Sequence, residues 1–286
     1  MQDVVQKLVD LLNVEKVDAD HFRGQSEDLG FKNVFGGQVV GQAMMAAYQT
    51  VENRLAHSMH GYFLRPGDPH ADIEYEVHRI RDGRSFTTRR VMALQHGEEI
   101  FTLTASFQVE ESGFEHQLEM PEVEGPEGLK SELEMARRFQ HLIPEKLREK
   151  FTRDRPIEIR PINPINYLAP DKRPPIKHHW FRTASPLPDD PAIHQCLLAY
   201  ASDFGFLGTS LQPHGVSYYQ RGIQVASLDH AIWFNRHFRF DDWLLFSMES
   251  PSAAHARGLN RGNIFDRQGR LVASVAQEAL IRQWES

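Results

Sequence analysis

The chain has 286 residues, enough for one large domain or two of ordinary size. Its hydrophobic fraction of 41% and charged fraction of 25% are ordinary for a soluble globular protein. A net charge of −7 without a long basic run argues against nucleic acid or an anionic membrane as the main partner. No apolar run reaches the ~18–20 residues that span a bilayer, and no secretory signal is visible, so we expect a cytoplasmic protein. The single Cys196 excludes an intrachain disulfide.

Two helices are expected near the N-terminus. Residues 1–13 form an amphipathic pattern that Asp3 can cap, with the apolar side packed on the domain. A membrane-surface role is the alternative, which the few basic residues disfavour. Residues 35–50, FGGQVVGQAMMAAYQT, contain no charged residue, and glycines inside a helix cost up to ~1 kcal/mol each. We therefore expect another backbone to approach this helix closely. The Gly36-Gly37 pair lacks the following Lys-Ser/Thr of a phosphate-binding P-loop.

A group of strands and a linker follow. Four segments rich in β-branched and aromatic residues predict an antiparallel meander, at 57–65, 73–80, 86–95 and 100–109. From 110 to about 150 the sequence becomes acidic and contains prolines, which indicates a linker. Within it, Ser131 and Glu134 match a capping box and predict one helix. The prolines between 155 and 175 predict extended chain.

The segment 193–213 predicts a buried helix with very few polar residues. Asp203 is its only Asp, Glu, Lys or Arg. A lone carboxylate on an apolar helix loses solvation, and hydrogen bonds, a charged partner or a raised pKa must offset that cost. Asp203 is therefore a candidate general base. The alternative is that Asp203 caps a neighbouring turn or lies at the helix edge in water.

After this helix the first pattern returns. Further strands are expected at 224–234, 243–249, 258–265 and 271–281. The segment 60–64 (HGYFL) matches 230–234 (HAIWF) at an offset of 170 residues, and the offset becomes 172 near Gly97 and Gly269. We infer two copies of one α+β unit, each with a sheet curled around its own apolar helix, joined side by side. The expected boundaries are an N-terminal repeat at 1–110, a linker with one helix at 111–155 and a C-terminal repeat at 156–286.

Several long motifs resemble the acyl-CoA thioesterase II family. They are FRGQS at 22–26, VFGGQVVGQA at 34–43, YFLRPGD at 62–68, LDH at 228–230 with WF at 233–234, and VAQE at 275–278. The resemblance runs over nearly the whole chain. It implies an α+β double hot-dog fold, in which each antiparallel sheet wraps around a central helix. It also implies hydrolysis of fatty acyl-CoA thioesters to free fatty acid and coenzyme A, with no cofactor.

The same resemblance implies a catalytic group made of an Asp, a Thr and a Gln. Asp203 and Gln277 match in type and context, and Ser227 stands at the Thr position, where it keeps the hydroxyl and loses the stiffer χ1. We expect Asp203 to activate or orient a water that Ser227 and Gln277 hold. Backbone N–H groups near a central-helix N-terminus would meet the developing oxyanion. Taken alone, Ser227 is more typical of a strand-start hydroxyl and Gln277 of a solvent-facing strand residue.

Other chemistries fit the sequence less well. No G-x-S-x-G elbow is present, and the 15 histidines include no H-E-x-x-H, so neither a serine triad nor a metal site is expected. His57 falls on the counterpart of Ser227 at offset 170, but its helix at 35–50 has no carboxylate to orient an imidazole. Near the counterpart of Gln277 the first half has Ser106. We therefore expect one working site per chain, in the second half.

Two functional alternatives stay open at this point. One is a hot-dog hydratase or dehydratase that acts on enoyl or hydroxyacyl thioesters, and the other is a non-catalytic acyl-CoA binder. The expected partner is an acyl-CoA substrate, without nucleic acid or membrane insertion. We also expect the protein to form a homo-oligomer.

Overall fold

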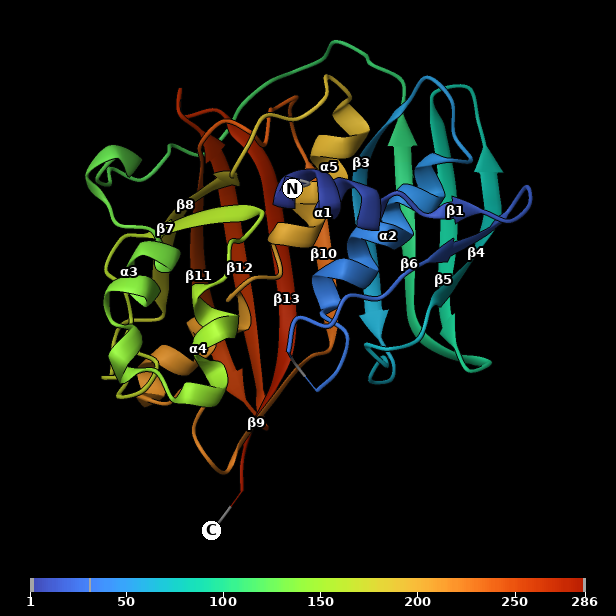
Figure 1. Cartoon of the computed structure of the whole chain (residues 1–286). Coiled ribbons are helices and arrows are strands. Elements are labelled where there is room, and N and C mark those ends of the chain that lie inside the picture. Colours follow the sequence, from blue (N-terminus) through green and yellow to red (C-terminus); the bar gives the residue numbers. More distant parts are fainter. Residues whose placement is uncertain (1–2, 31, 285–286) are drawn as a thin grey trace.

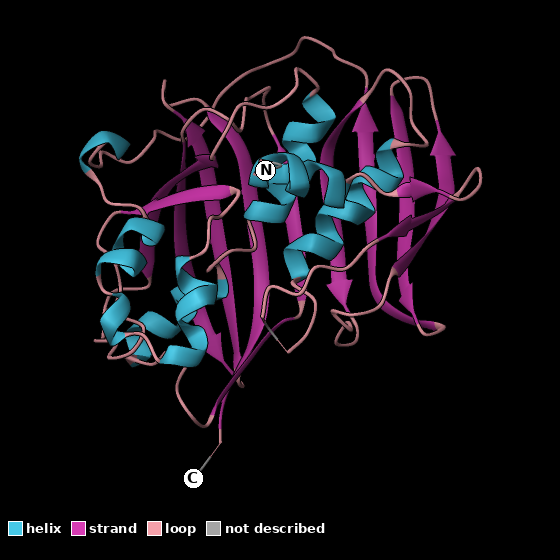
Figure 2. Ribbon diagram, in the orientation of Figure 1, coloured by secondary structure: helices cyan, strands magenta, loops and turns pink. Residues whose placement is uncertain are grey.

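The structure is a computed structural model that describes residues 3–30 and 32–284, except for the side chains of residues 146 and 147. Strands form one large antiparallel sheet, and helices lie against one of its faces (Figures 1 and 2). The first half contains α1 (Val4–Leu12), β1 (Glu15–Lys16), β2 (His21–Gly24), α2 (Gly36–Tyr48), β3 (Leu55–Phe63), β4 (Ile73–Asp82), β5 (Phe86–Gln95) and β6 (Glu98–Gln108).

The connecting segment and the second half complete the chain. The connection contains η1 (Pro126–Gly128), α3 (Glu132–Arg138), η2 (Gln140–Leu142) and α4 (Glu145–Thr152). The second half contains β7 (Ile157–Pro161), β8 (Ile176–Thr183), α5 (Pro191–Ala201), η3 (Leu207–His214), β9 (Ile223–Ser227), β10 (Asp229–Phe234), β11 (Leu244–Ala254), β12 (Arg257–Asp266) and β13 (Leu271–Gln283).

The strand order confirms the repeat and corrects the meander. The 13-stranded sheet runs β1-β2-β4-β5-β6-β3-β10-β13-β12-β11-β8-β7, with β9 paired to β13. In the first half β3 lies beside β6 rather than β4, and β10 lies beside β13 in the same way. A plain meander is therefore wrong. The strand that follows each central helix, β3 after α2 and β10 after α5, pairs with the third strand after it and not with the next one. The halves join side by side where β3 pairs with β10.

The two central helices pack against each other across small residues. Figure 1 shows α2 and α5 adjacent in front of the sheet. A Cβ at Gly37 would lie 2.3 Å from the carbonyl oxygen of Tyr200, and one at Gly41 would lie 3.2 Å from that of Cys196. The expected close approach of another backbone is confirmed. The approach explains why this helix tolerates glycine, since a side chain would separate the helices.

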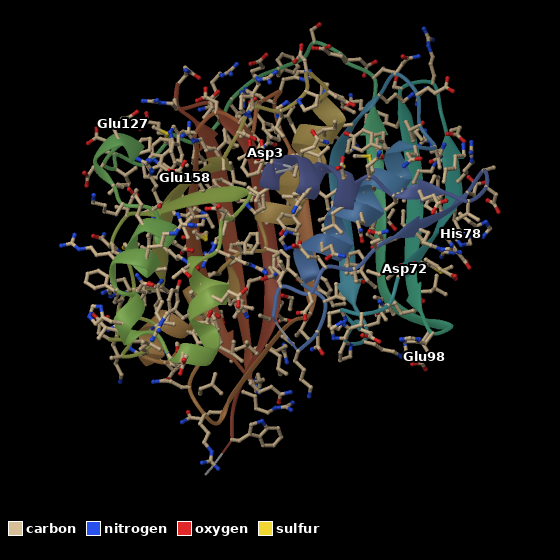
Figure 3. The ribbon with its side chains drawn as sticks, viewed as in Figure 1. Asp3, Asp72, His78, Glu98, Glu127 and Glu158 are labelled. Carbon is tan, nitrogen blue, oxygen red and sulfur yellow. The ribbon has the colours of Figure 1, made fainter. Side chains whose placement is uncertain are left out.

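Both expected helix caps are present. The Asp3 side chain, labelled in Figure 3, accepts a hydrogen bond from the Val5 N–H at 3.0 Å. Residues 1 and 2 of the expected first helix lie outside the described residues. Ser131 and Glu134 form the expected capping box at the start of α3. Within the described residues, no helix is long and apolar enough to cross a membrane.

The expected helix at 193–213 is wrong in its extent. The α-helix ends at Ala201, and a turn then leads to the 3-10 helix η3. The Ser202 hydroxyl donates to the Ala199 carbonyl oxygen directly after the last helical residue, and Gly205, in the turn that follows, adopts a positive φ of 65°, which suits glycine. Asp203 therefore lies in the turn after the helix and not on it.

Sequence patterns missed several strands because long-range pairing creates them, and they missed α4, so the one helix expected in the linker is too few. The short β1 and β2 extend one edge of the sheet, and β7 and β8 extend the other. The expected strand at 224–234 is interrupted at Leu228, whose carbonyl accepts from the Phe63 N–H while its own N–H donates to Glu278. Leu228 thus marks the point where this strand begins to pair with β3 as well as β13.

Candidate active site

The three expected site residues meet at one carboxylate. Asp203 lies in the turn after α5, Ser227 ends β9 and Gln277 lies in the middle of β13. The Asp203 Oδ1 atom accepts a hydrogen bond from Gln277 Nε2 at 2.6 Å and a longer one from Ser227 Oγ at 3.5 Å. Asp203 is 7% exposed, so these bonds offset much of its lost hydration. Both donors act on the same oxygen of the carboxylate.

Gln277 is a core residue and not a solvent-facing one. Its side chain is fully buried on the inner face of β13, with Nε2 also 3.2 Å from His230 Nδ1. Its Oε1 is buried without a partner among the described residues. A buried amide needs hydrogen bonds, and the Asp203 carboxylate supplies the shortest of them. The alternation of β13 places Gln277 on this inner face.

The second carboxylate oxygen faces the start of α2 in the first half. A Cβ at Gly36 would lie 2.9 Å from Asp203 Oδ2 and 3.0 Å from the Phe63 ring, so a side chain larger than that of glycine would disturb the contact. No side chain of the described residues caps α2, whose N-cap is Phe35. The first N–H groups of a helix have no partner inside the helix and lie at the positive end of its dipole. The site is thus built from both halves of the chain.

A groove of about 2200 Å³ passes beside this turn, although Asp203, Ser227, Gln277 and Gly36 are not among the residues that line it. Tyr200, Phe204 and Gly205, which lie on both sides of Asp203 in the sequence, line one part of it. Asp72, labelled in Figure 3, lines the part that belongs to the first half. The remaining walls come from α1, α3, α4, several strands and nearby loops, and carry apolar, basic and acidic side chains, among them Leu8, Phe139, Tyr167, Arg153, Lys177 and Glu132. The groove can hold a long ligand with an apolar part and an anionic part.

Residues 146–280 match the sequence model described as "Acyl-CoA thioesterase", and residues 25–108 match the one described as "Acyl-CoA thioesterase N-terminal domain". Acyl-CoA thioesterase 2 from Haemophilus influenzae is 47% identical over 283 residues, which cover 99% of both chains. The chain belongs to the acyl-CoA thioesterase family. The enzyme is also 40% identical to human acyl-coenzyme A thioesterase 8, over 95% of this chain and 88% of the human one.

Solved structures agree with this assignment. Acyl-CoA thioesterase II TesB2 from Mycobacterium marinum has a TM-score of 0.79 at 39% identity and covers 97% of this chain and 99% of its own. A hot-dog protein of unknown function from Alicyclobacillus acidocaldarius, 18% identical, has a TM-score of 0.78 over 98% and 99% of the two chains, which shows the fold alone. The expected α+β double hot-dog thioesterase is confirmed. The hydratase and non-catalytic alternatives receive no support from the named relatives.

The corresponding place in the first half of the thioesterase lacks the amide. The turns at Gly97 and Gly269 share a φ of 78°, and from there the buried faces of β6 and β13 match residue by residue, which pairs Ala105 with Gln277. Ser106 lies on the opposite face and instead places its Oγ 2.8 Å from His57 Nε2. The counterpart of Gln277 is therefore Ala105, one residue before Ser106, which was expected near that position. Burial lowers the pKa of His57.

The register of β3 and β10 also differs by one residue from the sequence match. His60 is exposed, whereas His230 is fully buried. Met59 and Gly61 are the buried residues that correspond to His230 and Ile232. The sequence match paired the right strands but opposite faces, because strand faces alternate with every residue. The same shift makes Ala56, and not His57, the counterpart of Ser227.

Two components of the site were missed by sequence reasoning. Gly36 was noticed for its helix cost but not as a neighbour of Asp203, and His230 was noticed within its motif but given no role. For His230 the available signal was its position in a strand next to a candidate site residue. Among the described residues, no group of three His, Cys, Asp or Glu side chains is arranged to hold a metal ion.

Proposed function

We propose that the chain hydrolyses fatty acyl-CoA thioesters at Asp203, through attack by a water molecule that this carboxylate orients and deprotonates. The observation that carries the proposal is that the two oxygens of the Asp203 carboxylate have different surroundings. Its Oδ1 is bonded to Gln277 and Ser227, while its Oδ2 faces the uncapped N-terminus of α2. One oxygen is fixed and the other is directed at the place where an oxyanion would be stabilised.

The contacts change the roles expected for Ser227 and Gln277. Both donate to Asp203, so they support holding the base rather than holding the water directly. A carboxylate that cannot rotate loses little orientational freedom when it takes a proton from water. The Ser227 oxygen keeps lone pairs that can accept a bond from the same water.

The first turn of α2 is the proposed oxyanion site. The N–H groups of Gly36 and Gly37 have no intrahelical partner, and the helix dipole adds positive potential there. A thioester carbonyl bound to them would lie next to Asp203 Oδ2. Donors placed in advance where negative charge develops are a large contribution to catalysis. The thiolate of CoA is a good leaving group, so no strong general acid is required.

The groove supports the binding of the rest of the substrate. We assign its apolar walls to the acyl chain and its basic side chains, including Arg153 and Lys177, to the anionic CoA. A cytoplasmic location and a homo-oligomeric state also stay proposals. Tyr62, 60% exposed on β3, and Trp233, 39% exposed on β10, support an association surface on the outer sheet face.

Thiol release tests the activity. Purified protein without added metal is expected to release free CoA thiol from medium- or long-chain acyl-CoA. The proposed chemistry uses only side chains and backbone N–H groups, so EDTA is expected to leave the rate unchanged. Loss of all activity on chelation, or no thiol release from any chain length, would contradict the proposal.

Isotope labelling tests the route. Asp203 could instead attack the carbonyl and form an anhydride. In a single turnover in H₂¹⁸O, water attack places the label in the fatty acid and none in the protein. Label found in the Asp203 peptide by mass spectrometry would establish the anhydride route instead.

A further inference from the structure

His230 lies behind the proposed site, fully buried on β10. Its Nδ1 is 3.2 Å from Gln277 Nε2, and its Nε2 is 2.9 Å from Ser202 Oγ. Ser202 is the residue before Asp203 in the chain. The imidazole therefore bridges the amide that bonds Asp203 and the turn that carries Asp203.

One arrangement of the protons satisfies every contact of this network. The Ser202 hydroxyl has one proton and donates it to the Ala199 carbonyl oxygen at 3.0 Å. In this arrangement it accepts a bond from His230, whose Nε2 carries the proton. In the neutral ring Nδ1 is then an acceptor, and it can accept only from an N–H of Gln277. Burial lowers the pKa of His230, which favours this neutral form.

The same placement fixes the orientation of the Gln277 amide. The atom that lies 3.2 Å from His230 Nδ1 is the atom that lies 2.6 Å from Asp203 Oδ1. It must be the nitrogen, because a carbonyl oxygen there would face an ionised carboxylate and an imidazole acceptor. An amide rotated by half a turn would lose both bonds and turn its oxygen toward Asp203, so the bond to His230 Nδ1 adds to the preference that the carboxylate already imposes.

We propose that His230 is a positioning residue of this thioesterase, which holds the Gln277 amide with its nitrogen toward Asp203. The inference rests on the proposed function, since it assigns His230 a role through Gln277. The first half offers an internal contrast, because Met59 stands at the corresponding position and Ala105 at that of Gln277. Imidazole and amide are present together in one half and absent together in the other.

Two variants distinguish the roles of the two ring nitrogens of His230, because each keeps the hydrogen bond of one nitrogen and removes that of the other. His230→Asn places a carbonyl oxygen near the Nδ1 position, where it can still accept from Gln277. His230→Gln places an amide nitrogen near the Nε2 position, where it can still donate to Ser202, but leaves Gln277 without its acceptor. We expect kcat of the Asn variant to stay within about 5-fold of wild type and that of the Gln variant to fall by about 30-fold or more, with KM little changed in both.

A double-mutant cycle with Gln277→Ala makes the test independent of general damage to the core. Once the amide is absent, His230→Gln is expected to cause no further loss of kcat. Should His230→Gln fail to fold, Ser202→Ala carries the same cycle, because it removes the acceptor of the Nε2 proton. Losses that multiply in the double variant, or a Gln variant as active as the Asn variant, would overturn the role of His230. An active Asp203→Asn control would instead refute the proposed function itself.

Discussion

The two central helices end alike and lead to different surroundings. Thr50 after α2 and Ser202 after α5 each donate their hydroxyl to the carbonyl oxygen of an alanine three residues earlier, at 2.8 and 3.0 Å. The next residue is Val51 in the first half and Asp203 in the second. The local fold is therefore retained in both copies, while the carboxylate is present in one.

In the first half, the side chain of Arg89 occupies the space beside the end of α2. Arg89 is 2% exposed, lies opposite Ala105 in the sheet and makes five hydrogen bonds, among them to Thr50 and to Asp82 at 2.7 Å. Each donor of its guanidinium is used inside the fold. In the second half, Oδ2 of Asp203 accepts no bond from any side chain that the structure describes. The polar groups of the first copy bond one another inside the fold, whereas those of the second bond Asp203, the carboxylate that we propose as the base.

The N-terminal ends of the two helices also differ, because a side chain caps α5 and none of the described side chains caps α2. The start of α5 has Pro191 at its first position and is capped by the Asp190 side chain, which accepts from the Ala192 N–H at 2.9 Å. The start of α2 has Gly36 and no side-chain cap among the described residues. Each half thus supplies the end that the other lacks. The comparison teaches that one site needs both copies, although its acid lies in one.

Gly36→Ala is the variant expected to have the largest effect on this arrangement. The new Cβ would lie 2.9 Å from Asp203 Oδ2, so the carboxylate or the helix start must move. We expect kcat to fall by about 100-fold or more, as for a misplacement of catalytic groups by up to 1 Å. Gly41→Ala is the matched control on the same helix, where the Cβ meets Leu12 and the Cys196 carbonyl but no site residue. Equal kcat losses in both variants would contradict the account.

Substitution of Ser227 is expected to have a smaller effect. Its bond to Asp203 is long at 3.5 Å, so removal leaves the shorter bond from Gln277 in place. We expect Ser227→Ala to lower kcat by about 10- to 100-fold, or about 1.4–2.7 kcal/mol of barrier, and Ser227→Thr to keep most of it. An Ala variant as fast as wild type in the thiol assay would remove Ser227 from the site.

Arg89→Ala is expected to affect stability rather than catalysis. The variant leaves a cavity and deprives Thr50 of its buried donor. We expect the free energy of unfolding to fall by about 2–5 kcal/mol, as when a large buried side chain is truncated, with kcat per folded molecule almost unchanged. Urea unfolding and the thiol assay measure the two quantities. A stable variant without activity would show that the first-half pocket takes part in the chemistry.

His57→Ala is expected to have the smallest effect. His57 bonds Ser106 on the outer side of the sheet and is not among the partners of Asp203. We expect the variant to keep most of its kcat. A His57 variant that folds but does not turn over substrate would argue for a second catalytic group in the first half.

Much of the fold could be predicted from the sequence, because the spacing of apolar residues and the turn residues between segments are local signals. The β5 strand was expected at its observed bounds, and the caps at Asp3 and Ser131 were expected from short motifs. The order of strands was not predictable in this way, since the pairing of β3 with β6 and β10 depends on residues far apart in the chain. The end of α5 before Asp203 was also missed, because an apolar run does not distinguish a helix from a buried turn.

The site was predictable only in part. Asp203 stood out as a lone charge, whereas Ser227 and Gln277 were assigned through family resemblance and not through spacing. His230 and Gly36 could not be assigned from sequence, because a shift of one residue decides which strand face is buried, and a contact between two halves leaves no local pattern.

The measurement that tests the central claim most directly is kcat of Asp203→Asn. The variant keeps the size of the side chain and removes its charge, and circular dichroism confirms folding. The account places the only working carboxylate of the chain at this position, so turnover is expected to be abolished while His57→Ala, measured in the same assay, remains active. An active Asn variant beside a folded but inactive His57 variant would place the chemistry in the first half and contradict the account.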